Sequence, residues 1–211
     1  INSFTEANSL NNVLMLEDSV NNIDLKEAIA NKAGLAYYYD RNDEEDLESL
    51  RNAKDAFKES LRIREYMYAE QGDEMLDELG YTNRVIGDLN RELELFISSE
   101  ESYLAAKKYY EKLFTTKKGE GEVPYFRTIY ALGDLYQANL DRAKEAEKLY
   151  RESLEVYNNM DNQNKLEVQK AYYYLLNDLI TVIQESKLDS SDLETLMKLR
   201  DSTKKELEKK S

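Results

Sequence analysis

Carboxylates are the groups in this sequence with the greatest potential for chemistry. The 211 residues include 43 Asp and Glu but neither cysteine nor histidine. Thiol nucleophiles, Ser-His-Asp triads, disulfides and the usual zinc or haem ligands are therefore excluded together. A carboxylate pair could still hydrolyse glycosides, but among so many acidic residues some pair will lie at a suitable distance by chance. We predict no catalytic residue, no metal site and no cofactor.

Three aspartates occupy one equivalent place in a repeated segment. The copies that begin at residues 86, 132 and 176 read IGDLN, LGDLY and LNDLI, and a weaker copy, AGLAY, begins at residue 33. Their second position, the glycine slot, falls at residues 34, 87, 133 and 177, at intervals of 53, 46 and 44 residues. Such periodicity is typical of helical repeat proteins, with one helix pair in each interval. The aspartates that follow the slot are Asp88, Asp134 and Asp178.

Hydrophobic spacing places these segments on helices. Apolar residues recur at three- and four-residue steps, and one proline and seven glycines leave few breaks. The pattern predicts an all-α chain with a repeat domain over residues 25–200, built from helix hairpins over 25–69, 73–116, 123–159 and 164–209. We expect one more helix over 4–18 in the N-terminal segment 1–24, as half of a truncated repeat, and a helix end and tail over 201–211.

The net charge and the hydropathy limit the choice of partner. Lys and Arg number 29 against 43 acidic residues, so the formal net charge is -14. This field repels a phosphate backbone and argues against nucleic acid. No stretch approaches the roughly 18 apolar residues of a membrane helix, so we expect a soluble protein without membrane insertion. Since the chain starts at Ile1 without a visible leader, we interpret it as a fragment or a processed product of unknown compartment.

A small–aromatic–small pattern recurs in the second helix of three hairpins. Such an order lets two helices approach at the small residues while the aromatic ring fills the remaining gap. The expected triplets are Ala53, Phe57 and Ser60; Ala105, Tyr109 and Lys112; and Ala146, Tyr150 and Ser153. With the first-helix segment that runs from Leu132-Gly133 to Tyr136, this order resembles the tetratricopeptide repeat family.

The resemblance implies a right-handed superhelical solenoid of about four antiparallel helix hairpins, in which each hairpin buries its face by stacking on its neighbours. The intervals exceed the family's usual length of about 34 residues, which is similar to its longer-helix members such as kinesin light chains. Lys112 and Arg200 stand where a small residue is usual, and Asn90 replaces an aromatic residue. We interpret the fourth copy, with Leu193 and Met197 ahead of Arg200, as a hairpin that caps the stack.

In this family the first helices line a concave groove, so the resemblance implies that the groove receives a peptide. Its lining is expected three residues before, one after and four after each glycine slot. These residues are Asn31 and Tyr38; Arg84, Asp88 and Arg91; Tyr130 and Asp134; and Tyr174 and Asp178, with Arg127 beside them. We interpret the aspartates as an acidic ladder for Lys or Arg of a partner, and Tyr130 and Tyr174 as contacts for its apolar parts. In the alternative, the aspartates are solvated or pair with the three arginines.

The resulting prediction is a non-enzymatic scaffold that binds another protein or a peptide with basic and hydrophobic residues. Three other functions stay open. Exposed terminal hairpins could stack between copies and form a structural homo-oligomer. The repeats could instead form a regulatory module that senses a signal peptide. A hydrolase with two carboxylates is the third, and it requires them to face each other in a closed apolar pocket.

Overall fold

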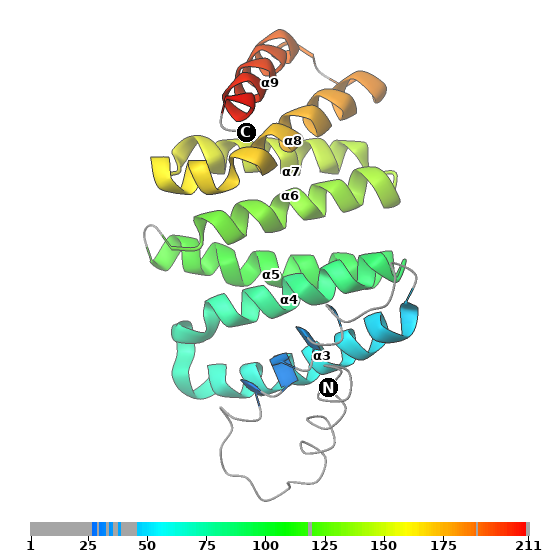
Figure 1. The fold of residues 1–211 in the computed structure, drawn as a ribbon, viewed down its shortest axis with the longest axis vertical. Helices are drawn as coiled ribbons and strands as arrows, with labels where there is room; N and C mark the ends of the chain where they lie inside the picture. Colours follow the sequence, from blue (N-terminus) through cyan, green and yellow to red (C-terminus); the bar gives the residue numbers. More distant parts are fainter. Residues whose placement is uncertain are drawn as a thin grey trace, which may run out of the picture. The chain divides into compact units, whose positions relative to one another are not determined.

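The structure is a computed structural model that describes residues 27, 28, 30–32, 34, 35, 38, 46–117, 120–188 and 190–209. These residues form helices joined by short turns, and no strand occurs among them. The prediction of an all-α chain is therefore confirmed (Figure 1). The helix expected over residues 4–18 lies outside the described residues.

The chain divides into two compact units, Ile1–Tyr109 and Tyr110–Ser211. The first unit contains the helical residues between 27 and 38, followed by α3, a short 3-10 helix and α4 (Figure 1). Helix α5 begins in this unit and ends in the second one. The elements are α3 (Leu47–Gln71), η1 (Gly72–Met75), α4 (Leu76–Glu92) and α5 (Phe96–Thr116).

Helix α3 has a capping residue at each end. The Asp46 carboxylate accepts a hydrogen bond from the Ser49 backbone N–H at 3.0 Å, which satisfies one of the free donors of the first turn. At the other end Gly72 has a φ of 64°, a conformation that L side chains rarely adopt. Its N–H donates to the Tyr68 carbonyl. The glycine therefore ends the helix with a turn that leads into η1.

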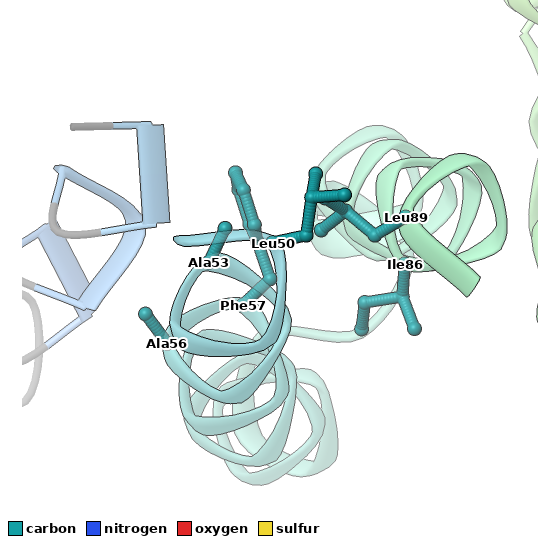
Figure 2. Packing of buried hydrophobic residues seen from close by; sticks show 6 residues of the cluster. All are labelled: Leu50, Ala53, Ala56, Phe57, Ile86 and Leu89. Carbon is teal, nitrogen blue, oxygen red and sulfur yellow. The ribbon is translucent and has the colours of Figure 1, made fainter. Parts of the chain in front are cut away.

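Two apolar clusters fill the first unit. In one, Leu50 and Phe57 of α3 meet Ile86 and Leu89 of α4, as Figure 2 shows. Leu35, from the helical segment before α3, packs against the same cluster. A second cluster joins that segment to α3, η1 and α4, and its buried residues are Ala30, Ile63, Met67, Met75 and Leu79. The helical segment before α3 is thus part of the core.

A buried ion pair also holds that segment. Arg64 of α3 and Glu27 are 2.7 Å apart, with 7% and 18% of their side chains exposed. The Arg64 guanidinium further donates to the Glu78 carbonyl at 2.9 Å and to the Thr82 hydroxyl, both on α4. Ser60 donates to the same Glu27 carboxylate at 3.1 Å. Three consecutive helical segments therefore share one polar network in an otherwise apolar region.

The second unit contains the end of α5 and four further helices. Helix α6 packs against α7, α7 against α8, and α8 against α9. Helices α6 and α8 also contact each other directly, although α7 lies between them in the sequence. The bounds are α6 (Glu122–Asn139), α7 (Ala143–Asn159), α8 (Asn162–Glu185) and α9 (Leu193–Glu208). This contact brings equivalent positions of two first helices to one surface.

Three of the four glycine slots carry a glycine that faces an aromatic ring of the following helix. A Cβ atom at Gly133 would lie 2.7 Å from the Tyr150 ring, and one at Gly87 would lie 2.7 Å from the Tyr103 ring. In the first copy, a Cβ at Gly34 would lie 2.8 Å from Phe57. Such distances are shorter than real Cβ contacts, so the missing side chain is what lets each ring approach. The close packing expected from the small–aromatic pattern is present.

The triplet expected on α5 is wrong by six residues. Ser99, Tyr103 and Ala106 are buried and have the four- and three-residue spacing of the triplet. Ala105 and Tyr109 are half-buried and Lys112 is exposed. Because Tyr103, not Tyr109, lies against the glycine slot, Ala106 holds the last small position of the triplet. The departure attributed to Lys112 therefore does not exist.

The fourth triplet is displaced as well. On α9 the buried side chains are Leu196 and Thr203, with Arg200 half-buried between them at the same four- and three-residue spacing. Met197, expected at the aromatic position, is 37% exposed. The residues at this spacing are therefore shifted by three positions from the expected ones.

Candidate partner-binding surface

Asp88 of α4 is held by two neighbours in the first unit. Its Oδ1 accepts a hydrogen bond from the Tyr103 hydroxyl at 2.6 Å, and its Oδ2 accepts one from Arg84 Nη1 at 2.9 Å. The Arg84 pair spans one helical turn, and the two side chains are 27% and 37% exposed. Both carboxylate oxygens are thus engaged within the chain, as the alternative interpretation of this aspartate expected.

The charges around Asp88 act in opposite directions. Burial raises the pKa of the Asp88 carboxyl, while Arg84, the Tyr103 hydrogen bond and Arg91 lower it. Burial and the neighbouring aspartate raise the pKa of the Tyr103 hydroxyl above its ordinary value, so tyrosine remains the donor. Glu92 raises the pKa of Asp88 further, so two arginines and two carboxylates lie here and their formal charges balance. The negative charge of Asp88 is therefore neutralised locally by the arginines of the same helix.

The other candidate residues of the first unit lie on the segment before α3. Tyr38 donates from its hydroxyl to the Glu92 carboxylate of α4 at 3.2 Å, next to Arg91 in the sequence. Asn31 is half-buried on the same helical segment. Its Oδ1 is buried without a hydrogen bond from the described residues. The structure thus brings Tyr38 beside α4 and leaves the Asn31 side-chain oxygen without a hydrogen bond from the described residues.

The second unit has a different arrangement, in which a tyrosine joins two helices. The Tyr130 hydroxyl of α6 donates to Asp178 Oδ2 of α8 at 2.5 Å. Asp134 lies one helical turn after Tyr130 on α6. Its negative charge raises the pKa of both Tyr130 and Asp178, so it lies close to each of them. Three candidate residues from two first helices thus meet at one place.

Burial is the main cause of the raised pKa values at this place. It raises the pKa of the Asp178 carboxyl; the Tyr130 hydrogen bond lowers it and Asp134 raises it further. Burial, followed by the contact with Asp178, raises the pKa of the Tyr130 hydroxyl. The ring of Tyr130 packs against two other aromatic rings, with centroids 5.9 Å from Tyr150 and 6.4 Å from Phe126.

Arg127 and Tyr174 lie on the same two helices as these carboxylates but contact other residues. Arg127 of α6 forms an ion pair with Glu167 of α8 at 3.1 Å, and both side chains are about half exposed, at 47% and 54%. The arginine thus pairs with a glutamate. Tyr174 precedes Asp178 by one turn of α8, and its ring lies 5.6 Å from the Tyr173 ring and 5.9 Å from Lys170 Nζ. Its side chain is 48% exposed.

Asp134 and Asp178 are half-buried carboxylates beside aromatic rings. A carboxylate in such surroundings can accept a charge-assisted hydrogen bond from a cationic group. No group of three or more acidic residues able to hold a metal ion occurs in the part of the chain that the structure describes.

Asp178→Asn is expected to change how stability depends on pH. Because the folded-state pKa is raised, the folded chain binds the proton more tightly than the unfolded chain, whose carboxyl pKa is about 3.9. The contribution of Asp178 to the free energy of unfolding is therefore complete below about pH 3.9 and is lost as the pH rises through the folded pKa. Urea unfolding across this range should show the variant gaining stability relative to wild type as the pH rises.

Tyr130→Phe is the matched comparison for this measurement. It removes the hydrogen bond that lowers the Asp178 pKa, so its stability should fall more steeply with pH than that of wild type. A difference between Asp178→Asn and wild type that stays flat, or that falls as the pH rises, would contradict the raised pKa.

The sequence did not predict which residues contact the candidate side chains Asp88 and Arg127. The wrong triplet on α5 led away from Tyr103, although Tyr103 follows Gly87 by 16 residues and Tyr150 follows Gly133 by 17. Glu167, the partner of Arg127, carries no signal of its own because it lies 40 residues away on another helix. One further contact, from the Tyr150 hydroxyl to the Gln137 side chain at 2.8 Å, joins the ring of the triplet to the first helix.

Comparison with known proteins supports the fold. No protein-family model matches the chain, and no curated protein sequence matches it. Among solved structures, the crystal structure of BtubC (BKLC) from P. vanneervenii is similar, with a TM-score of 0.71 and 17% sequence identity. The alignment covers 97% of this chain and 74% of BtubC. At this identity the likeness shows the fold alone, which is that of a helical repeat.

No helix in the described parts of the chain is long and apolar enough to cross a membrane.

Proposed function

We propose that the chain is a non-enzymatic scaffold of the tetratricopeptide kind, a right-handed solenoid of four helix hairpins that binds a segment of another protein along its first helices. The fold likeness to BtubC supports the repeat. So do the three contacts between a glycine slot and an aromatic ring, which show one packing rule used three times.

The main support for the binding site is the interaction of Tyr130 and Asp134 of α6 with Asp178 of α8. Equivalent positions of α6 and α8 come together there, as repeat stacking requires. The described residues give Asp178 one hydrogen bond, from Tyr130, whereas a carboxylate offers about four acceptor sites. The remaining sites can accept from a guanidinium or an ammonium group of the partner.

The acidic ladder is accordingly proposed in a narrower form. Asp88 already serves Arg84 and Tyr103, so a partner cation would have to displace both of them. Asp178, which can accept further hydrogen bonds, is therefore assigned to the basic residue of the partner, and the negative charge of Asp134 adds to the attraction. Arg84 and Arg91 remain on the lining of the first unit, where Asp88 holds Arg84 in place.

Apolar contact has to supply most of the affinity. An exposed ion pair contributes about 0.2–1 kcal/mol, and two of them fall well short of the roughly 8 kcal/mol of a micromolar complex. Tyr174, 48% exposed and one turn before Asp178, offers an aromatic face next to the carboxylates. The proposed ligand is thus a segment with a Lys or Arg close to a bulky apolar residue.

Selection from random peptides displayed on phage tests this proposal. Wild-type protein should enrich peptides in which a basic residue lies near an aromatic or aliphatic one. The control selection uses Asp134→Asn/Asp178→Asn, from which the basic residue should disappear while the apolar preference stays. Enrichment of acidic peptides by the wild type, or the same basic consensus on both proteins, would contradict the assignment. A size that grows with concentration and no enriched peptide would favour self-assembly.

A further inference from the structure

An open cavity of about 310 Å³ lies in the second unit, and none of the candidate partner-binding residues lines it. It is formed where the end of α7, the start of α8 and the end of α9 come together. The lining residues are Tyr157, Asn162, Lys165, Leu166, Gln169 and Glu206. Ligand pockets in proteins start at about 300 Å³, so the volume suits a small molecule and not a folded partner.

Lys165 and Glu206 give the cavity opposite charges, and each can form further hydrogen bonds. Lys165 Nζ donates to the Asn158 carbonyl at 2.8 Å, which uses one of the three donors of an ammonium group. Glu206 Oε2 accepts from Gln169 Nε2 at 2.9 Å, so its other oxygen and further lone pairs are available. The same space thus offers donors for an anionic group and acceptors for a cationic one.

The cavity also offers an apolar surface. Leu166 is 60% exposed although it lines a hollow. The Tyr157 ring is held flat against the Tyr172 ring, with centroids 3.6 Å apart and planes at 4°, so its orientation is fixed before any ligand binds. Lys165 Nζ lies 5.8 Å from the Tyr157 ring, and Glu206 lies close enough to raise the pKa of the Tyr157 hydroxyl in addition to the effect of burial. Both charges therefore flank one aromatic residue.

We infer that this cavity binds a small zwitterion with an apolar body, a free α-amino acid with an aliphatic or aromatic side chain. The ligand carboxylate binds Lys165, its ammonium group binds Glu206, and its side chain lies against Leu166 and Tyr157. The inference is independent of the proposed partner surface, because none of the residues that line the cavity belongs to that surface.

Titration of ¹⁵N-labelled protein with L-phenylalanine or L-leucine, followed by NMR, tests the inference. Amide signals of the lining residues should shift and saturate, whereas L-phenylalaninamide and N-acetyl-L-phenylalanine, which each lack one charge, should bind at least fivefold more weakly. Lys165→Met and Glu206→Gln should each weaken binding of L-phenylalanine at least fivefold. Lys170→Met is the control, since Lys170 lies on α8 near Tyr174 and outside the cavity.

Two results would overturn the inference. One is the absence of any saturable shift with both amino acids while the wild-type spectrum is that of a folded protein. The other is equal binding by wild type and Lys165→Met, which would show that the charges play no part. Since Lys165 makes an exposed hydrogen bond and Glu206 a partly buried one, both variants should keep the wild-type spectrum outside the cavity.

Discussion

Tyr150→Ala is expected to lower the free energy of unfolding by about 3–5 kcal/mol, the cost of a large cavity in a core. The side chain is completely buried, and its ring lies directly against Gly133. Its hydroxyl also donates to Gln137 at 2.8 Å, so that acceptor loses its partner too. Denaturant unfolding followed by circular dichroism measures the change. Tyr174→Ala, which truncates a tyrosine that is 48% exposed, should stay within about 0.5 kcal/mol of wild type.

Because of this contact, the effect of Gly133→Ala on the free energy of unfolding should change sign when the Tyr150 ring is absent. In wild type, Gly133→Ala forces a methyl group to 2.7 Å from the ring, and overpacking of about 1–3 kcal/mol exceeds the helix preference for alanine of about 0.5–1 kcal/mol. In the Tyr150→Ala background the ring is gone, so the same substitution should stabilise. A cost that is equal in both backgrounds would contradict the proposed packing rule.

Glu27→Ala is expected to cost about 3 kcal/mol, because it leaves the Arg64 guanidinium buried without its counter-charge. Arg64 is 6% exposed, and its remaining acceptors are the neutral Glu78 carbonyl and Thr82 hydroxyl. The same unfolding measurement applies. Glu59→Ala breaks the exposed pair with Arg62 and should change stability by less than about 1 kcal/mol.

Replacement of both charged residues shows whether Glu27→Ala loses stability because Arg64 lacks a counter-charge or because side-chain volume is lost. Glu27→Leu/Arg64→Met removes the charges and keeps apolar bulk, and it should recover most of the loss. If Glu27→Ala proves as mild as Glu59→Ala, the segment that carries Glu27 is not held by this pair. The double variant would then have no loss to recover.

The helical class and the glycine slots could be predicted because both depend on local spacing. Apolar residues at three- and four-residue steps indicate helices whatever their neighbours are. Gly87 and Gly133 stand out because they recur in similar segments. Each of them proved to face an aromatic ring, so the repeat in the sequence reflects a repeat in packing.

The register of α5 could not be predicted because that helix carries two competing patterns. Small and aromatic residues occur at the right spacing both at Ser99 and Tyr103 and at Ala105 and Tyr109. Sequence spacing alone does not choose between them; the choice depends on which ring meets Gly87. The three-residue connection from Leu93 to Leu95 delivers Tyr103 to that place.

The candidate site was harder to predict than the helices. All three aspartates have the same place in the repeat, yet their surroundings differ through residues on other helices. Asp88 has an arginine one turn earlier, whereas Tyr130 stands at the equivalent position before Asp134. That single exchange turns an internal ion pair into a tyrosine that crosses to Asp178. Contacts of this kind depend on packing between helices, which spacing does not encode.

The binding of a selected basic, apolar peptide to Asp134→Asn/Asp178→Asn, compared with wild type, tests the central claim most directly. Isothermal titration at low and moderate salt measures both affinities, and Glu155→Gln/Asp201→Asn, which neutralises two exposed acids elsewhere in the second unit, is the matched control. Loss of two ion pairs of about 0.2–1 kcal/mol each predicts roughly 2- to 30-fold weaker binding, with a smaller salt dependence. Equal loss in the control variant, or no loss in the test variant, would contradict the claim.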